Sequence, residues 1–184
     1  MRVTATDIEG VLVRDLVPHA DARGDLTEFF RAEWNSTAKP VQWNCVRSRK
    51  NALRGVHVHV RHFDYLAIMQ GIVLVGLHDL RSGSASYGRG ALIKIDEARP
   101  SALEIPPGVA HGFYCIQDAT LAYGVSHYWD NNDELGCRWD DPGLRIGWPD
   151  IDPILSPRDL GLGTMQQVEA EVNAAMRGEL CVSA

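Results

Sequence analysis

Short apolar runs separated by turn residues dominate the chain from residue 10 to about residue 150. The runs are rich in β-branched and aromatic side chains, and Gly, Pro, Asp and Ser stand between them. Runs of this length and spacing predict the strands of a β-sandwich or barrel rather than alternating strand–helix units. The predicted strands cover residues 10–16, 65–69, 72–77, 91–95, 102–105, 112–116 and 121–125.

A different pattern follows near the C-terminal end of the sequence. Between residues 165 and 176, Val168, Val172 and Met176 recur at every fourth position, which predicts one short helix. Earlier, Gln70-Gly71 separates two predicted strands and predicts a tight turn. Residues 29–34 fit either a short helix or the end of a strand.

Composition places these elements in an ordinary globular chain. The sequence has 184 residues, 45% of them hydrophobic and 23% charged, with no repeat, low-complexity segment or linker. A chain of this length can bury one sizeable core. We therefore expect a single domain over residues 1–184, mainly β, with a short C-terminal helix.

Charge and cysteine content narrow the classes of function. The formal net charge of −6 disfavours general binding to nucleic acid or to anionic membranes, although it does not exclude a local basic pocket. The four cysteines form no CxxC pair, and no apolar run has the roughly 20 residues of a membrane span or forms a signal-peptide core. We expect a cytoplasmic protein with reduced thiols.

The densest chemical feature is a histidine-rich segment that begins at Arg54. If this segment is a strand, His57 and His59 project from the same face, and Asp64 follows close behind. Further on, a Pro-Pro-Gly turn precedes His111. The spacing in both parts resembles the two-part signature of the cupin barrel, a double-stranded β-helix or jelly roll, and implies that these four side chains face one cavity.

Two chemistries compete for that cavity. Three imidazoles and a carboxylate, from His57, His59, His111 and Asp64, are a suitable set for Fe, Mn, Ni or Zn. Proton transfer instead needs a histidine of near-neutral pKa that faces an acid across the substrate. The residue types alone leave both possibilities open.

From residue 10 to residue 159, the sequence resembles the dTDP-4-dehydrorhamnose 3,5-epimerase family. These sugar-nucleotide epimerases are built on a cupin-type barrel, are usually dimeric and need no metal. The matching stretches, in the family's order, are residues 21–24, 28, 42–44, 53–57, 79–84, 105–113, 121–123, 139–142, 146–149 and 155–159.

The resemblance implies roles for three residues. His57 would be the base that removes a proton next to a C4 ketone, Asp159 would orient His57 and make it more basic, and Tyr123 would be the acid on the opposite face. Each residue also has a purely structural alternative. Asp159 could cap a helix, and Tyr123 could be a core aromatic residue.

The resemblance also implies a site for a nucleotide-diphosphate sugar. Two arginine forks suit the oxygens of a diphosphate, although Arg54 could instead brace a strand end. Tyr128 and Trp129 are candidate walls for the base or the sugar. The expected substrate-binding positions are Arg23, Glu28, Gln42, Asn44, Arg54, His59, Asp64, His111, Tyr128 and Arg158. A homodimer is expected because the family exchanges N-terminal strands, with residues 10–16 as the candidate strand.

The sequence departs from the family at the most informative position. Asp64 stands where the family carries a Lys that holds the oxygen on which enolate charge develops, and a carboxylate there would repel that charge. His59 replaces a common Gln. Three interpretations follow: an epimerase for another 4-keto sugar nucleotide without a cofactor, a metal-dependent cupin isomerase, lyase or dioxygenase using His57, His59, Asp64 and His111, and a non-catalytic sugar-nucleotide-binding protein.

Overall fold

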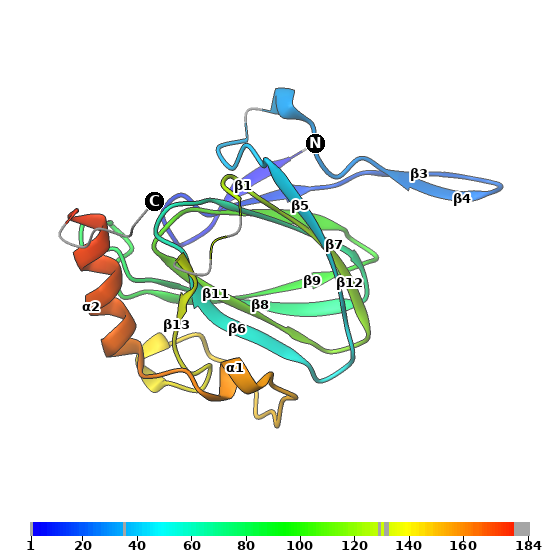
Figure 1. Ribbon diagram of the computed structural model, residues 1–184. Helices are drawn as coiled ribbons and strands as arrows, with labels where there is room; N and C mark the ends of the chain where they lie inside the picture. The colour runs from blue at the N-terminus through cyan, green and yellow to red at the C-terminus, as the bar shows by residue number, and fades with distance from the viewer. Residues whose placement is uncertain (1, 35, 129, 131–132, 179–184) are drawn as a thin grey trace.

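The computed structural model describes residues 2–34, 36–128, 130 and 133–178. Two antiparallel β-sheets curve around a common interior and form a barrel, with helices at one side and below it (Figure 1). The six-stranded sheet has the order β1-β2-β10-β7-β12-β5 and the five-stranded sheet the order β13-β6-β11-β8-β9. Neighbouring strands are mostly distant in sequence, so the chain crosses repeatedly between the sheets. This is the expected mainly β jelly-roll barrel.

The bounds of the strands are as follows. In the six-stranded sheet they are β1 Val3–Ala5, β2 Leu12–Asp15, β5 Gln42–Ser48, β7 Asp64–Gln70, β10 Ser101–Ile105 and β12 Ala119–Val125. In the five-stranded sheet they are β6 Leu53–Val58, β8 Ile72–Asp79, β9 Gly90–Asp96, β11 Val109–Cys115 and β13 Leu135–Gly136. A separate hairpin consists of β3 Pro18–Asp21 and β4 Gly24–Thr27.

The main hydrophobic core lies between the two sheets. It is built from apolar side chains of both, for example Ile68 and Leu121 from one sheet and Val75 and Leu77 from the other. A second apolar layer covers the outer face of the five-stranded sheet, where Val168 of the C-terminal helix packs with residues of β6. Because both faces of β8 are covered, nearly the whole strand is buried, as its uninterrupted apolar sequence requires.

The structure confirms the predicted elements. Each predicted strand coincides with or overlaps an observed one, and the C-terminal helix α2 spans Met165–Met176. Thr164 caps α2 in a capping box with Gln167. Gly71 makes the turn between β7 and β8 with a φ of 87°, which favours glycine. Residues 29–34, left open above, contain the short 3-10 helix η1 Ala32–Trp34.

Two further short helices complete the described chain. These are the 3-10 helix η3 Pro142–Leu144 and the helix α1 Pro157–Leu160. None of the helices in the described residues has the length and apolar character needed to cross a membrane. Within the same residues, Cys45, Cys115 and Cys137 are free thiols.

The hairpin of β3 and β4 projects away from the barrel as an arm (Figure 1). All of its residues but one are exposed, including Leu26 at 64%. The expected exchange strand, residues 10–16, behaves differently, because β2 within it pairs with β1 on one edge and with β10 on the other. Both edges of that strand are therefore occupied within its own chain, and the projecting element is the following hairpin.

Candidate active site

A cavity of about 280 Å³ opens between the two sheets. Its wall combines apolar side chains with a dense set of histidines and carboxylates. The polar lining residues are Asn44, Arg54, His57, His59, His62, Asp64, His111, Tyr123, Glu134, Ser156, Arg158 and Asp159. A hollow with this mixture of apolar walls and convergent titratable groups is the form that most small-molecule sites take.

His57 is held by a carboxylate that comes from a distant part of the chain. It lies on β6, directly opposite His111 of β11 in the sheet register. Asp159 lies in α1, and its Oδ1 is 2.7 Å from Nε2 of His57. Burial would raise the pKa of Asp159, but the hydrogen bond and charge of His57 together with hydrogen bonds from Ser156 and the Gly55 backbone outweigh burial, and the pKa is lowered. The ionised carboxylate therefore accepts the Nε2 hydrogen and leaves Nδ1 of His57 with a lone pair.

The local structure explains how Asp159 reaches this position. Ser156 caps α1 by accepting a hydrogen bond from the backbone N–H of Asp159, so Asp159 is in the first turn and is not the cap. Its side chain is free of the capping role and turns inward, where the residue is 5% exposed. The capping alternative considered from the sequence is therefore wrong.

Tyr123 approaches the cavity from the opposite sheet. It lies on β12, next to Asn44 of β5 and Leu66 of β7, whereas His57 belongs to the five-stranded sheet. Burial, with a further contribution from Asp64, raises the pKa of Tyr123. The phenol is therefore protonated at neutral pH. The cavity thus has a histidine on one wall and a proton donor on the facing wall.

Two glycines allow β6 and β11 to approach closely beside His57 and His111. Gly55 has a φ of 117°, and a Cβ at that position would lie 2.7 Å from Cα of Gly112. A Cβ on Gly112 would lie 2.7 Å from the carbonyl oxygen of Arg54. Either side chain would force the strands apart. The contact therefore fixes the spacing of His57 and His111, which lie beside it.

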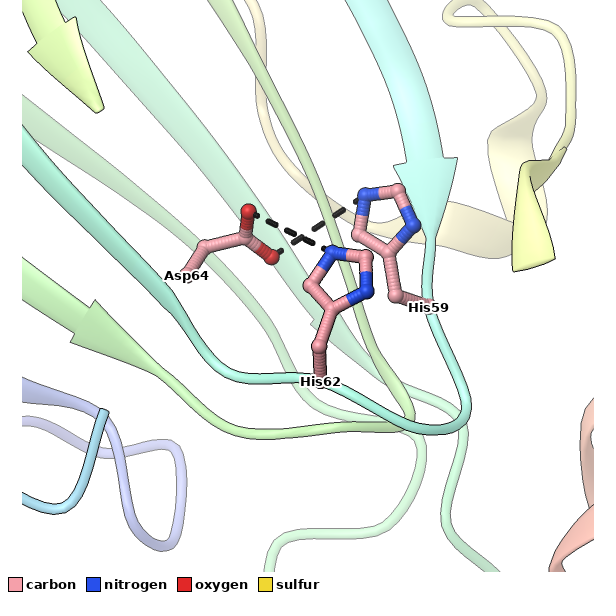
Figure 2. Close-up of side chains that lie close together, drawn as sticks. All are labelled: His59, His62 and Asp64. Atoms are coloured by element: carbon pink, nitrogen blue, oxygen red, sulfur yellow. Dashed lines mark ion pairs between the residues drawn. The ribbon is translucent and has the colours of Figure 1, made fainter. Parts of the chain in front are cut away.

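A second group of side chains, the His59–His62–Asp64 cluster, also lines the cavity (Figure 2). Both imidazole rings face the carboxylate of Asp64, and the rings stack with centroids 4.1 Å apart. Nε2 of His59 is 3.9 Å from Oδ2 of Asp64, and Nε2 of His62 is 3.7 Å from Oδ1. One ligand atom from each residue lies within 4.8 Å of the others.

Buried carboxylates give the cluster a negative electrostatic environment. Burial would raise the pKa of Asp64, but His111, His62 and His59 outweigh it and the pKa is lowered. Burial would also raise the pKa of Asp133, but His62 and the Val60 N–H outweigh burial, and the pKa is lowered. Burial would lower the pKa of His62, yet Asp133 and Asp64 raise it to about 9. The cluster therefore favours positive charge between two ionised carboxylates.

The metal set expected from the sequence, His57, His59, Asp64 and His111, is arranged differently in the structure. All four side chains line the cavity. However, among the residues that the structure describes, the group close enough to share an ion consists of His59, His62 and Asp64. His57 is not part of this group, and its Nε2 is bonded to Asp159.

Besides His59 and Asp64, four of the expected substrate-binding residues line the cavity. These are Asn44, Arg54, His111 and Arg158. Nε of Arg54 donates to Ser48, and Arg158 pairs with Glu134 at 2.8 Å. Both arginines are largely exposed, so their guanidinium groups lie toward the open side of the cavity.

Four other expected binding residues do not line the cavity of their own chain. Arg23 lies on the turn of the arm, exposed and paired with Asp21, and Glu28 pairs with Arg31. Gln42 donates to Asn44 from the edge strand β5, and Tyr128 is 76% exposed. The expected roles of these four residues in substrate binding stay predictions. Trp129 lies outside the described residues.

Sequence reasoning missed His62, Asp133 and Glu134. His62 was set aside because it lies outside the spacing of the cupin signature. In the structure β6 ends at Val58, and the following loop brings His62 back beside His59. The signal available was three histidines and an aspartate within eight residues. No sequence pattern connects that segment with Asp133, which lies 71 positions after His62.

Comparisons with known proteins agree with this geometry. A sequence model of the dTDP-4-dehydrorhamnose 3,5-epimerase family matches residues 5–167. A dTDP-4-dehydrorhamnose 3,5-epimerase of Neisseria gonorrhoeae is 34% identical, covering 81% of this chain and 48% of its own length. A dTDP-4-dehydro-6-deoxyglucose 3-epimerase of Streptomyces bikiniensis is 33% identical, covering 88% of each. The matched region therefore spans about half of the first protein and most of the second.

A solved structure shows the same architecture. It is the dTDP-6-deoxy-D-glucose-3,5-epimerase of Legionella pneumophila in complex with dTDP-4-keto-L-rhamnose. The two chains are 28% identical and superpose with a TM-score of 0.85, covering 93% of this chain and 96% of the Legionella chain.

Proposed function

Because the chain belongs to the dTDP-4-dehydrorhamnose 3,5-epimerase family, we propose that it epimerises a nucleotide-linked 4-keto-6-deoxy sugar. The reaction removes a proton from a carbon next to the C4 ketone and returns a proton to the opposite face of that carbon. The observation that carries this proposal is the position of His57 and Tyr123 on facing sheets across one cavity.

The surroundings of the two side chains suit these roles. His57 takes the substrate proton on Nδ1 while Asp159 holds its Nε2–H and stabilises the imidazolium that forms. Tyr123, protonated at neutral pH, donates to the other face of the enolate. Proton removal and return leave the oxidation state of the sugar unchanged, so the proposed reaction needs no redox cofactor.

The dimensions and charges of the cavity support a sugar nucleotide as substrate. A volume of about 280 Å³ suits the sugar ring, and the diphosphate would extend through the open side to Arg54 and Arg158. The Legionella structure holds a dTDP-linked keto sugar in the same fold. Both relatives named above are 3-epimerases or 3,5-epimerases, so we place one site of proton exchange at C3.

The proposal extends to the assembly and location of the protein. We propose a homodimer in which the β3–β4 arm packs on the second copy, because the arm exposes Leu26 and the edge strand β5 exposes Trp43. This arrangement would give Arg23 and Glu28, which have no place in their own cavity, a role at the partner's. The free thiols of the described chain support a cytoplasmic location.

Solvent deuterium exchange into dTDP-4-keto-6-deoxyglucose tests the proposal. The wild-type enzyme is expected to incorporate deuterium at C3 and to invert that carbon. His57→Ala should abolish exchange and leave nucleotide binding nearly intact, whereas Tyr123→Phe should still exchange but should lose inversion by roughly 10²-fold. Incorporation and configuration are both measured by NMR.

His127→Ala provides the matched control, because His127 is exposed and is not among the residues lining the cavity. It should exchange at the wild-type rate. Normal exchange by His57→Ala would show that the base is wrongly assigned. Absence of exchange in the wild-type enzyme would overturn the proposed function for this sugar.

A further inference from the structure

Three imidazole rings in the cavity make the same kind of hydrogen bond with their Nδ1 atoms. Nδ1 of His59 is 2.9 Å from the backbone carbonyl oxygen of Asp133, and Nδ1 of His111 is 3.1 Å from that of Val109. Nδ1 of His62 is 3.1 Å from Oδ2 of Asp133. Carbonyl and carboxylate oxygens only accept, so Nδ1 carries the hydrogen in each ring. The available nitrogen of each ring is therefore Nε2.

All three Nε2 atoms face the carboxylate of Asp64. The separations are 3.9 Å for His59, 3.7 Å for His62 and 3.6 Å for His111. These distances exceed the roughly 2.7–3.2 Å of an N–H···O hydrogen bond. Three imidazole nitrogens that converge on one carboxylate at these separations leave room for a cation among them.

The separations are close to those within a metal coordination shell. Two ligand atoms that are each about 2.1 Å from an ion lie roughly 3.0–3.4 Å apart in octahedral or tetrahedral geometry. A contraction of a few tenths of an ångström would bring each of the three Nε2–carboxylate distances into that range. The surroundings also favour coordination. His59, His62 and Asp64 are only 7%, 4% and 6% exposed, so water competes little for their ligand atoms.

We propose that His59, His62 and Asp64 bind a divalent first-row transition metal, with the Nε2 atom of His111 facing the same ion. Imidazole nitrogen with one carboxylate suits Zn²⁺, Fe²⁺, Co²⁺, Ni²⁺ or Mn²⁺. Asp133 supplies the outer shell, since its carbonyl and carboxylate fix the rings of His59 and His62. His57 stays outside the site and keeps its partner Asp159.

The consequence for catalysis rests on the proposed function. Asp64 and Glu134 line the same cavity as His57 and Tyr123, so negative charge that develops on an enolate oxygen there is opposed by carboxylates. A divalent ion between these groups offsets that charge and can polarise the ketone. The ion would thereby add positive charge beside the developing enolate.

Metal binding is tested on the full-length protein with no substrate present. Chelator-treated protein is titrated with Zn²⁺ by calorimetry and separately with Co²⁺, whose visible absorption reports coordination by nitrogen ligands. We expect one equivalent of each ion to bind. His62→Gln and Asp64→Asn should each weaken Zn²⁺ affinity by at least about 100-fold, whereas His127→Gln should leave it unchanged.

Circular dichroism of each variant separates loss of ligand from loss of fold. If His62→Gln does not fold, the Co²⁺ spectrum of the wild-type protein and the affinity of Asp64→Asn decide the question. A wild-type protein that binds no stoichiometric Zn²⁺ overturns the proposal. Binding that persists unchanged in both His62→Gln and Asp64→Asn also overturns it, because the ion then lies elsewhere.

This result and the test of the proposed function can differ. Stoichiometric metal binding without deuterium exchange would support the site and overturn the epimerase assignment. Exchange at an equal rate in metal-free and Zn²⁺-loaded protein would support the epimerase and overturn the catalytic role of the ion.

Discussion

The cavity contains two histidine–carboxylate groups that begin two residues apart in the sequence and differ in spacing. In the His57–Asp159 pair, nitrogen and oxygen are 2.7 Å apart. In the His59–His62–Asp64 cluster, the facing atoms are 3.7 and 3.9 Å apart. The first spacing fixes a hydrogen and suits proton transfer, whereas the second leaves room for a cation. Residue types alone do not distinguish the two uses, but distance does.

The largest expected effect comes from breaking the His57–Asp159 pair. Asp159→Asn replaces the ionised acceptor with an amide, so the His57 ring loses both its fixed tautomer and the stabilisation of its imidazolium form. We expect kcat for epimerisation to fall by roughly 10²–10⁴-fold with little change in nucleotide affinity. Steady-state kinetics and nucleotide titration measure these two quantities.

Asp150→Asn is the matched control for this variant, since Asp150 is exposed and lies outside the cavity. Its kcat should equal that of the wild-type enzyme. A kcat within threefold of wild type for Asp159→Asn would show that His57 works without its partner.

A smaller effect is expected from changing the outer shell of the His59–His62–Asp64 cluster. Asp133→Asn keeps the backbone carbonyl that holds His59 but removes the charge that holds His62. We expect Zn²⁺ affinity to fall by about 10–100-fold, less than after loss of a ligand. Calorimetric titration measures the change, with Asp140→Asn as a surface control that pairs only with Arg138 among the contacts described.

An Asp133→Asn variant with wild-type Zn²⁺ affinity would show that ring orientation does not depend on this carboxylate. In contrast, a loss as large as that of Asp64→Asn would make Asp133 a ligand.

The smallest expected effect concerns Asp79, a fully buried carboxylate remote from both groups. Burial would raise its pKa, but hydrogen bonds from Arg81, Ser84 and Ser86 outweigh burial and lower it. A lowered pKa stabilises the folded chain at pH values above the ordinary value of 3.8, and this contribution is lost as pH falls through the folded-state pKa.

Asp79→Asn should therefore reduce the free energy of unfolding by about 1.5–3 kcal/mol at pH 7 and flatten its decline below about pH 4. Urea unfolding between pH 3 and 7 measures both. An unchanged acid profile would show that other carboxylates dominate acid unfolding.

The sequence predicted the strands and the C-terminal helix because their apolar patterns reflect burial directly. Val168 and Val172, four residues apart, are both buried in the second apolar layer. Patterns of this kind depend on local periodicity alone, so they can be recognised without knowledge of the tertiary structure.

The site was predicted less completely because it depends on contacts between distant segments. The interaction of His57 with Asp159 joins residues 102 positions apart, and only the resemblance to a family indicated it. His62 was missed because it lies outside the cupin spacing, and only the loop after β6 brings it back beside His59. Arg23 and Glu28 lie on or beside an arm whose surroundings are not determined by one chain.

The close approach of Gly55 and Gly112 limits how the His57–Asp159 pair and the His59–His62–Asp64 cluster can change. Because two backbones are in contact there, any side chain added at either position shifts His57 and His111 together and alters proton transfer and ion binding at once. Independent adjustment of the two chemistries must come instead from Asp159 on one side and Asp133 on the other. A change in the strands therefore alters the geometry of both groups, whereas a change at Asp159 or Asp133 alters one group at a time.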